Sequence, residues 1–251
     1  MTLTLLVTGA TAGIGAAIAR RGVADRHRVI AAGRRADRLD ALAAELGENL
    51  LALPFDLTDT RATDALPGTL PEGWREVDVL VNNAGLARGI APAQSAAIAD
   101  WDQMIAANVT GLVHLTRAML GGMIARDRGH IVNVGSVAGD FPYPGGNVYG
   151  ATKAFVKQFT LGLKADLAGT NVRVTNVEPG MVGGTEFSNV RLGDDARAAK
   201  VYEGADALSA GDIADIVAWV ISRPARVNIS RVQVMPTCQG PGPMNIKRAG
   251  R

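Results

Sequence analysis

The sequence predicts an α/β fold: a single domain in which a doubly wound parallel sheet is covered by helices on both faces. Short apolar segments recur between stretches of helical periodicity, which is typical of alternating strands and helices. A length of 251 residues with no recognisable linker suits one such unit. Polar or small residues follow several apolar segments directly. The expected strands are residues 3–7, 29–32, 50–53, 77–81, 131–134, 172–177 and 232–235.

The first strand leads into a glycine-rich turn and then a helix. The turn is Thr8-Gly9-Ala10-Thr11-Ala12-Gly13-Ile14-Gly15, and an alanine-rich helix without proline is expected over 16–26. Bare glycine backbone at such a turn allows a pyrophosphate to approach, and helix N–H groups face its charge. The strand, turn and helix together therefore predict a nucleotide-binding site.

The end of the second strand indicates which nucleotide binds. An acidic residue there would accept hydrogen bonds from the ribose of NAD, but the segment instead ends in Gly33-Arg34-Arg35. Guanidinium groups suit a 2′-phosphate, so Arg34, assisted by Arg35, is expected to select NADP(H). The alternative is that both arginines merely occupy a solvated helix start.

Three further helices are expected, over 101–123, 149–167 and 211–221. Residues 183–207 are polar and contain glycine, and we expect them to form a mobile lid over the substrate, with a plain surface loop as the alternative. Polar or small residues at the expected strand ends gather along one edge of the sheet, where such folds bind ligands. These residues are Thr8, Gly33, Asp56, Asn82, Ser136 and Pro179.

Tyr149, Lys153 and Ser136 form the most informative constellation. Tyr149 and Lys153 are four residues apart in an expected helix, so they share one face. A free phenol has a pKa of about 10 and exchanges protons poorly near neutrality, but an adjacent cation favours the phenolate. The Ser136 hydroxyl could hold a substrate oxygen while Tyr149 moves its proton.

Composition excludes several other classes of protein. The formal net charge is +2 and no block of like charges is present, which argues against a nucleic-acid surface. No apolar run is long enough for a membrane span, and the amino terminus lacks a secretory signal, so a soluble cytoplasmic protein is expected. Cys238 is the only cysteine, which rules out an intrachain disulfide and a cysteine-rich metal site. His27, His114 and His130 lack metal-ligand spacing, so no metal is expected.

The motifs together resemble the short-chain dehydrogenases/reductases over nearly the whole chain. The resemblance rests on the glycine turn, Asn82-Asn83-Ala84-Gly85, Asn108, Ser136 and the Tyr149/Lys153 pair. Residues 145–155 and 178–191 are similar to the NADP-dependent 3-hydroxy acid dehydrogenases, a group with serine, allo-threonine and malonic semialdehyde activities. The resemblance implies a Rossmann-type fold, with a cofactor half at about 1–135 and a catalytic half at about 136–251. It also implies a homotetramer assembled through the helices at 101–123 and 149–167.

The resemblance further implies a role for each site residue. Tyr149 would be the general acid or base, Lys153 would lower its pKa and bind the nicotinamide ribose, Ser136 would orient the reacting oxygen, and Asn108 would lie near a water that links Lys153 to solvent. Asp56 matches the position that bonds the adenine, although a structural role remains open. The residues expected to contact the cofactor are Gly9, Thr11, Gly13, Ile14, Gly15, Arg34, Arg35, Asp56, Leu57, Asn82, Ala84, Gly85, Tyr149, Lys153, Pro179, Gly180, Val182 and Thr185. The usual Pro-Gly-x-Val-x-Thr is here Pro-Gly-Met-Val-Gly-Gly-Thr, and the extra glycine leaves the role of Thr185 open.

The expected reaction is hydride transfer between the nicotinamide and a small 3-hydroxy acid of the serine, allo-threonine or 3-hydroxypropionate class. Its carboxylate needs a cation; Arg191 is the first candidate and Arg88 the second, beside Ser136 and Tyr149. A 3-oxoacyl-carrier-protein reductase or another ketone reductase is one alternative. A non-catalytic NADP-binding regulatory protein is another, although it would be expected to have lost Ser136, Tyr149 or Lys153. No nucleic-acid or membrane partner is expected.

Overall fold

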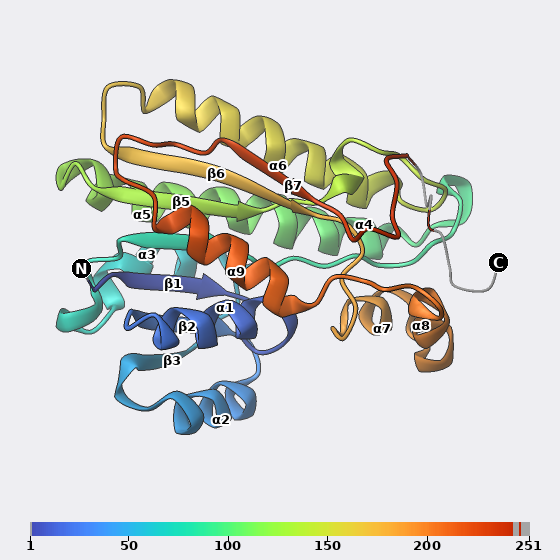
Figure 1. The fold of residues 1–251 in the computed structure, drawn as a ribbon, viewed down its shortest axis with the longest axis horizontal. Helices are drawn as coiled ribbons and strands as arrows, with labels where there is room; N and C mark the ends of the chain where they lie inside the picture. The colour runs from blue at the N-terminus through green and yellow to red at the C-terminus, as the bar shows by residue number, and fades with distance from the viewer. Residues whose placement is uncertain (1, 243–245, 247–251) are drawn as a thin grey trace.

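The computed structural model describes residues 2–242 and 246. It contains a seven-stranded parallel sheet in the order β3-β2-β1-β4-β5-β6-β7 (Figure 1). This order places the crossover between β1 and β4, as in Rossmann-type doubly wound sheets. All seven expected strands are confirmed, with ends shifted by at most two residues. The strands are β1 Thr4–Thr8, β2 Arg28–Gly33, β3 Leu50–Pro54, β4 Val79–Asn82, β5 Gly129–Val134, β6 Val172–Pro179 and β7 Arg231–Val234.

Successive strand residues point to opposite faces and join two separate cores. In β1, Leu5 and Val7 belong to one apolar cluster, and Leu6 belongs to the other. The first cluster lies under α1 (Gly13–Ala24), α2 (Ala36–Leu46) and α9 (Ala210–Ile221). The second lies under α3 (Thr60–Thr69), α5 (Leu112–Ala125) and α6 (Asn147–Asp166). Helices therefore cover both faces, which confirms the predicted fold.

The helix expected over 101–123 is longer and less regular than predicted. It begins as α4 (Ile98–Ile105), passes through a π-helical segment η4 (Ala106–Gly111), and continues as α5. Single π-helical turns of this kind occur mostly at functional sites. Here the segment places the side chain of Asn108 in the interior, where it is 1% exposed.

The expected lid contains two short helices, α7 (Phe187–Leu192) and α8 (Asp195–Tyr202). Asp194 caps α8 by accepting a hydrogen bond from the Arg197 N–H at 2.9 Å. A bridge between Val182 and Leu208 joins the two ends of the segment. In Figure 1, α7 and α8 stand beyond the sheet, next to the carboxyl ends of its strands.

Short 3-10 turns complete the described chain; they are η1 Gly47–Asn49, η2 Glu72–Trp74, η3 Ala93–Ser95 and η5 Val137–Gly139. Across residues 2–242 and 246, no helix combines the length and the hydropathy that crossing a bilayer requires.

Candidate active site

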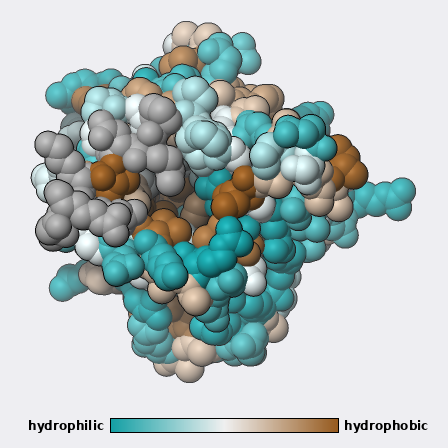
Figure 2. Space-filling model, turned by 90° about the vertical axis from the view of Figure 1, so that its right-hand side faces the viewer, coloured by the Kyte–Doolittle hydropathy of each residue, from teal (hydrophilic) through white to brown (hydrophobic). Residues whose placement is uncertain are grey.

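A large cavity lies at the carboxyl ends of the strands, where doubly wound sheets bind ligands. Its volume is about 1250 Å³. Figure 2 looks onto this end of the molecule, where the surface is hollowed and partly lined by hydrophobic residues. Most of the expected site residues line the cavity, although they are far apart in the sequence: Gly9, Thr11, Gly13, Ile14, Arg34, Arg35, Asp56, Leu57, Ala84, Gly85, Arg88, Ser136, Tyr149, Lys153, Pro179, Gly180, Val182, Thr185 and Arg191.

Gly15, Asn82 and Asn108 are the expected site residues that do not line the cavity. The buried amide of Asn82 donates to the Thr116 hydroxyl and to Asn133 Oδ1, both at 2.9 Å, so its side chain supports the sheet instead of facing a cofactor. The cavity wall at this strand end is formed by Asn83 instead. A Cβ on Gly15 would lie 2.3 Å from the Gly9 carbonyl oxygen, so this glycine permits close packing of helix and turn.

The glycine turn combines a close backbone approach with an open helix end. Gly9 has φ +68°, and a Cβ there would lie 3.0 Å from Ala84 Cα. The helix α1 begins at Gly13, three residues earlier than predicted, and Ala12 offers no side-chain cap. The first turn also lacks an acidic residue. Uncapped N–H groups at the cavity wall suit an anion such as a pyrophosphate.

The two arginines after β2 occupy different environments. Arg34 lies close enough to Asp56 for its charge to act on that carboxyl. Burial alone would raise the pKa of the Asp56 carboxyl, but hydrogen bonds from Thr58 and the charge of Arg34 together lower it. Arg35 donates to the Thr11 hydroxyl at 2.9 Å and forms an ion pair with Glu186 at 2.8 Å. Arg35 is thus already paired with an acidic residue of the lid segment, a contact that the sequence did not reveal.

Asp56 and Asp59 make different local hydrogen bonds after β3. Asp56 Oδ1 accepts hydrogen bonds from the Thr58 N–H at 2.9 Å and the Thr58 hydroxyl at 2.8 Å. Asp59 caps α3, because its Oδ1 accepts from the Ala62 N–H at 3.0 Å. Asp56 therefore has a structural role in this turn and also lines the cavity.

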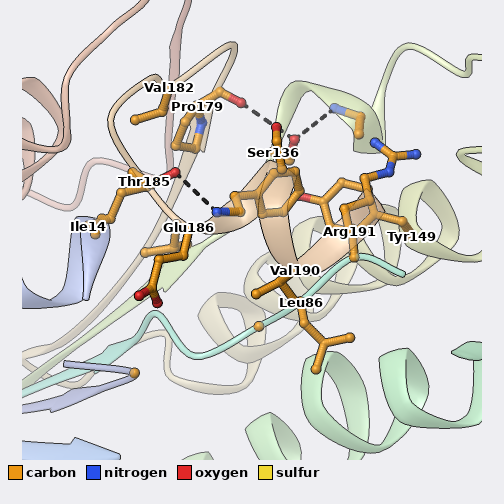
Figure 3. Close-up of a pocket in the computed structure, with 18 of the residues that line it drawn as sticks. Ile14, Leu86, Ser136, Tyr149, Pro179, Val182, Thr185, Glu186, Val190 and Arg191 are labelled. Carbon is orange, nitrogen blue, oxygen red and sulfur yellow. Dashed lines mark hydrogen bonds between the residues drawn. The ribbon is translucent and has the colours of Figure 1, made fainter. Parts of the chain in front are cut away.

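Ser136, Tyr149 and Lys153 come together at the end of β5 and the first turns of α6. Ser136 Oγ accepts from the Ala138 N–H at 3.1 Å and donates to the Pro179 carbonyl at 3.5 Å. Lys153 lies one helical turn after Tyr149, and its Nζ donates to the Val134 carbonyl at 2.8 Å. Figure 3 shows Ser136 beside the ring of Tyr149, at the end of the cavity that Arg191 also reaches. A hydroxyl, a phenol and a cation therefore line the same end of the cavity.

Asn108 is held rigidly behind this group. Its amide oxygen accepts from the Leu86 N–H at 2.9 Å, and its nitrogen donates to the Leu86 carbonyl at 2.9 Å and to the Thr152 hydroxyl at 3.1 Å. Gly85 lies between Asn108 and Lys153, since a Cβ there would be 3.1 Å from Asn108 Oδ1 and 3.5 Å from Lys153 Nζ. Asn108 and Lys153 therefore border the same small space beside Gly85.

Burial dominates the electrostatics of Tyr149 and Lys153. Burial raises the pKa of Tyr149, an effect that the nearby Ser136 hydroxyl and Arg191 guanidinium oppose. Burial lowers the pKa of Lys153 to about 8. The lowered phenol pKa expected from the sequence is therefore wrong for this arrangement, because the Lys153 ammonium points toward Val134 and lies 5.8 Å from the centre of the Tyr149 ring.

Arg191 carries positive charge to the catalytic end of the cavity. Its guanidinium donates to the Tyr143 hydroxyl at 2.7 Å and lies 5.9 Å from the centre of the Tyr149 ring. Arg88 instead donates to the Val190 carbonyl at 3.2 Å and so supports the lid segment. Of the two candidate cations, Arg191 is the one beside the catalytic phenol.

Sequence reasoning missed several residues of this end of the cavity. The ring of Phe187 lies 5.6 Å from that of Tyr149, and Tyr143 anchors Arg191. One signal was available, because the chain has three tyrosines and all of them, Tyr143, Tyr149 and Tyr202, line the cavity.

The histidines have structural partners. His27 Nδ1 accepts from the Leu3 N–H at 3.3 Å, His114 contacts Asp64 at 2.9 Å, and His130 contacts the Thr175 hydroxyl at 2.8 Å. Over the part of the chain that the structure describes, no cluster of three or more His, Cys, Asp or Glu side chains is arranged to hold a metal ion.

Comparisons with known proteins agree with this geometry. The short chain dehydrogenase family matches residues 3–195. The chain is 55% identical over 246 residues to the NADP-dependent 3-hydroxy acid dehydrogenase of Salmonella typhi, covering 98% of this chain and 99% of that protein. It is 50% identical over 240 residues to the serine 3-dehydrogenase of Agrobacterium fabrum, covering 95% and 96%.

A solved structure described as the closed form of serine dehydrogenase complexed with NADP+ superposes with a TM-score of 0.94. It is 52% identical to this chain, and the match covers 98% of this chain and 100% of the other. The cavity with its glycine turn, the group of Ser136, Tyr149 and Lys153, and these likenesses lead to one conclusion: the chain belongs to the short-chain dehydrogenase/reductase family.

Proposed function

We propose that this protein is an NADP-dependent oxidoreductase that transfers a hydride between the nicotinamide and C3 of a small 3-hydroxy acid. The observation that carries the proposal is a guanidinium, Arg191, beside the catalytic phenol of Tyr149, within a cavity that also holds Ser136 and Lys153. Relatives at 50% and 55% identity over almost their full length are named for serine and 3-hydroxy acid oxidation.

The cavity fits a phosphorylated dinucleotide along its length. Gly9 and the uncapped start of α1 offer backbone to a pyrophosphate, and Arg34 and Arg35 offer charge to a 2′-phosphate. Pro179, Gly180, Val182 and Thr185 line the wall toward the catalytic group, where the nicotinamide end would lie. When bound, the nicotinamide accepts or supplies the hydride. Residues from about 1–135 would thus hold most of the cofactor, and those from about 136–251 most of the chemistry.

Tyr149 would take the hydroxyl proton during oxidation and return it during reduction. Ser136 would hold the reacting oxygen in place, because its own hydroxyl is fixed by the Ala138 N–H and the Pro179 carbonyl. Lys153 would bind the nicotinamide ribose, and Asn108 would border the space through which the Lys153 ammonium exchanges protons with solvent. The Arg191 guanidinium opposes the effect of burial on the pKa of Tyr149.

Arg191 would bind the carboxylate of the substrate. Its Nη1 already donates to Tyr143, and its Nη2 donates to the Gly145 carbonyl at 3.3 Å, so the side chain is fixed beside the phenol. A fixed guanidinium favours a small carboxylate over an acyl thioester, which has no negative charge at this point.

A panel of substrates tests the proposal. Oxidation of 3-hydroxypropionate, serine and allo-threonine with NADP, followed by absorbance, is compared with reduction of an acyl thioester by NADPH. We expect at least one hydroxy acid to exceed the thioester in kcat/KM. Faster turnover of the thioester would instead establish the 3-oxoacyl reductase alternative, and NADPH binding without turnover of any substrate would establish a regulatory protein.

Homotetramer formation is also part of the proposal. Large apolar side chains remain exposed on the helices expected to form the subunit contact, and these are Ile98 and Ile105 on α4, Ile124 on α5, and Phe155 and Leu161 on α6. A second copy of the chain would cover such a surface. Light scattering at micromolar concentration should give the mass of four chains, and a monomer would rule this out. A cytoplasmic location agrees with the free thiol of Cys238.

A further inference from the structure

The short helix α7 connects the two functional ends of the cavity. Glu186 immediately precedes α7 and pairs with Arg35, at the end assigned above to the 2′-phosphate. Arg191, near the other end of the same helix, lies beside Tyr149. Figure 3 shows Glu186, Val190 and Arg191 around the same cavity as Ser136 and Tyr149.

The carboxylate of Glu186 pairs with Arg35, one of the two arginines that we propose bind the 2′-phosphate. Arg35 donates to Glu186 Oε1 through Nη1 at 3.2 Å, its Nη2 lies 2.8 Å from Oε2, and Nε and Nη2 both reach the Thr11 hydroxyl. All three nitrogens of this guanidinium therefore contact protein groups. Arg38 also acts on Glu186, whose pKa is lowered chiefly by the hydrogen bond from Arg35.

The geometry points to Glu186 as a specificity-determining residue that competes with the 2′-phosphate of NADP(H) for Arg35. A phosphate carries more negative charge than a carboxylate and accepts bidentate hydrogen bonds from arginine, so it displaces Glu186 from the guanidinium. The pair is easily displaced because both side chains are over 40% exposed. Glu186 thus weakens the binding of NADP(H) and leaves that of NAD(H) unchanged. This inference rests on the proposed function.

The test uses Glu186→Gln, which keeps the size of the side chain and removes its charge. Binding of NADPH and NADH to the full-length protein is followed by nucleotide fluorescence. We expect Glu186→Gln to bind NADPH about two- to fivefold more tightly, the range that an exposed ion pair implies, with NADH affinity unchanged. The matched control is Asp206→Asn, which removes a negative charge from the same segment at an exposed residue outside the cavity wall; it should change neither affinity.

A second substitution separates competition for Arg35 from a general effect of charge. In an Arg35→Met background, Glu186→Gln should no longer tighten NADPH binding. Unchanged or weaker NADPH binding by Glu186→Gln, an equal gain for NADH, or a full gain in the Arg35→Met background would each overturn the inference. Failure of the wild-type protein to bind NADPH at all would instead reject the proposed function.

Discussion

The two ends of the cavity differ in how firmly the protein holds its side chains. At the catalytic end, Tyr149 and Lys153 are 8% and 7% exposed, and Asn108 makes hydrogen bonds with both Leu86 and Thr152. At the phosphate end, Arg35 and Glu186 are over 40% exposed and bind each other. The difference suggests a division that can be tested: chemistry carried by rigid, buried groups, and the choice of cofactor carried by exposed charges.

The largest effect is expected at the buried end, from Tyr149→Phe. Removing the phenolic oxygen deletes the proton donor and acceptor while keeping the ring contact with Phe187. General acid–base catalysis contributes about 10² to 10⁴ in rate, so kcat should fall by that factor and NADPH affinity should stay nearly constant. Steady-state kinetics with nucleotide titration measure both. If more than about a tenth of wild-type turnover remains, another residue moves the proton.

At the exposed end, Arg34→Ala should change binding and spare chemistry. Charge-assisted hydrogen bonds contribute about 1.5 to 3 kcal/mol, so NADP(H) affinity should fall roughly ten- to a hundredfold and NAD(H) affinity should hardly change. Fluorescence titration with both nucleotides measures the ratio. Equal losses for the two cofactors would mean that Arg34 does not contact the phosphate. The exposed end of the cavity would then not determine the choice of cofactor through this residue.

Arg191→Lys tests the residue at the rigid end that we propose as the partner of the substrate carboxylate. A lysine keeps the charge, yet it cannot bond Tyr143, Gly145 and a carboxylate in one plane as the guanidinium can. We expect the KM for the hydroxy acid to rise by roughly tenfold with a smaller change in kcat, because one charged hydrogen bond is weakened. Initial rates over a range of substrate concentrations give this split, and an unaltered KM would point to Arg88.

The smallest effect concerns stability. The pKa of Lys153 is about 8 in the folded protein, below the value of about 10.4 expected in the unfolded chain. Between about pH 8 and pH 10.4, Lys153 binds more protons in the unfolded chain than in the folded protein. The unfolding free energy of the wild type therefore rises with pH over this range. Lys153→Met should therefore stabilise the protein by about 1–3 kcal/mol at pH 7 while abolishing activity, and the gain should disappear near pH 10.

Urea unfolding of wild type and Lys153→Met at pH 7 and near pH 10 measures this difference in unfolding free energy. A less stable Lys153→Met variant at pH 7 would mean that the hydrogen bond to the Val134 carbonyl outweighs the cost of burying the ammonium.

The sequence predicted most of the fold because local patterns and strand ends determine it. Alternating apolar strands and helices placed the seven strands, and the strand ends brought most site residues to one cavity. Long-range contacts account for what was missed. The π-helical segment at Asn108 depends on bonds to Leu86, and the two lid helices lie in a polar stretch whose ends are joined by Val182 and Leu208.

The candidate site shows the same limit. Motif spacing located Tyr149 and Lys153, but the pKa of Tyr149 depends on how deeply the phenol is buried, which spacing does not reveal. In the same way, Asn82 and Asn83 are adjacent in sequence, yet one supports the sheet and the other lines the cavity.

The placement of all three tyrosines around one cavity gives the protein an internal spectroscopic reporter. Ionisation of a phenol changes its near-ultraviolet absorbance, and in this chain every phenol belongs to the cavity that contains Ser136 and Lys153. A pH titration followed by that absorbance therefore records the protonation of the site alone, without an introduced probe. Comparing wild type with Tyr149→Phe separates the contribution of Tyr149 from those of its two neighbours, and burial should place its ionisation at a higher pH than that of a free phenol.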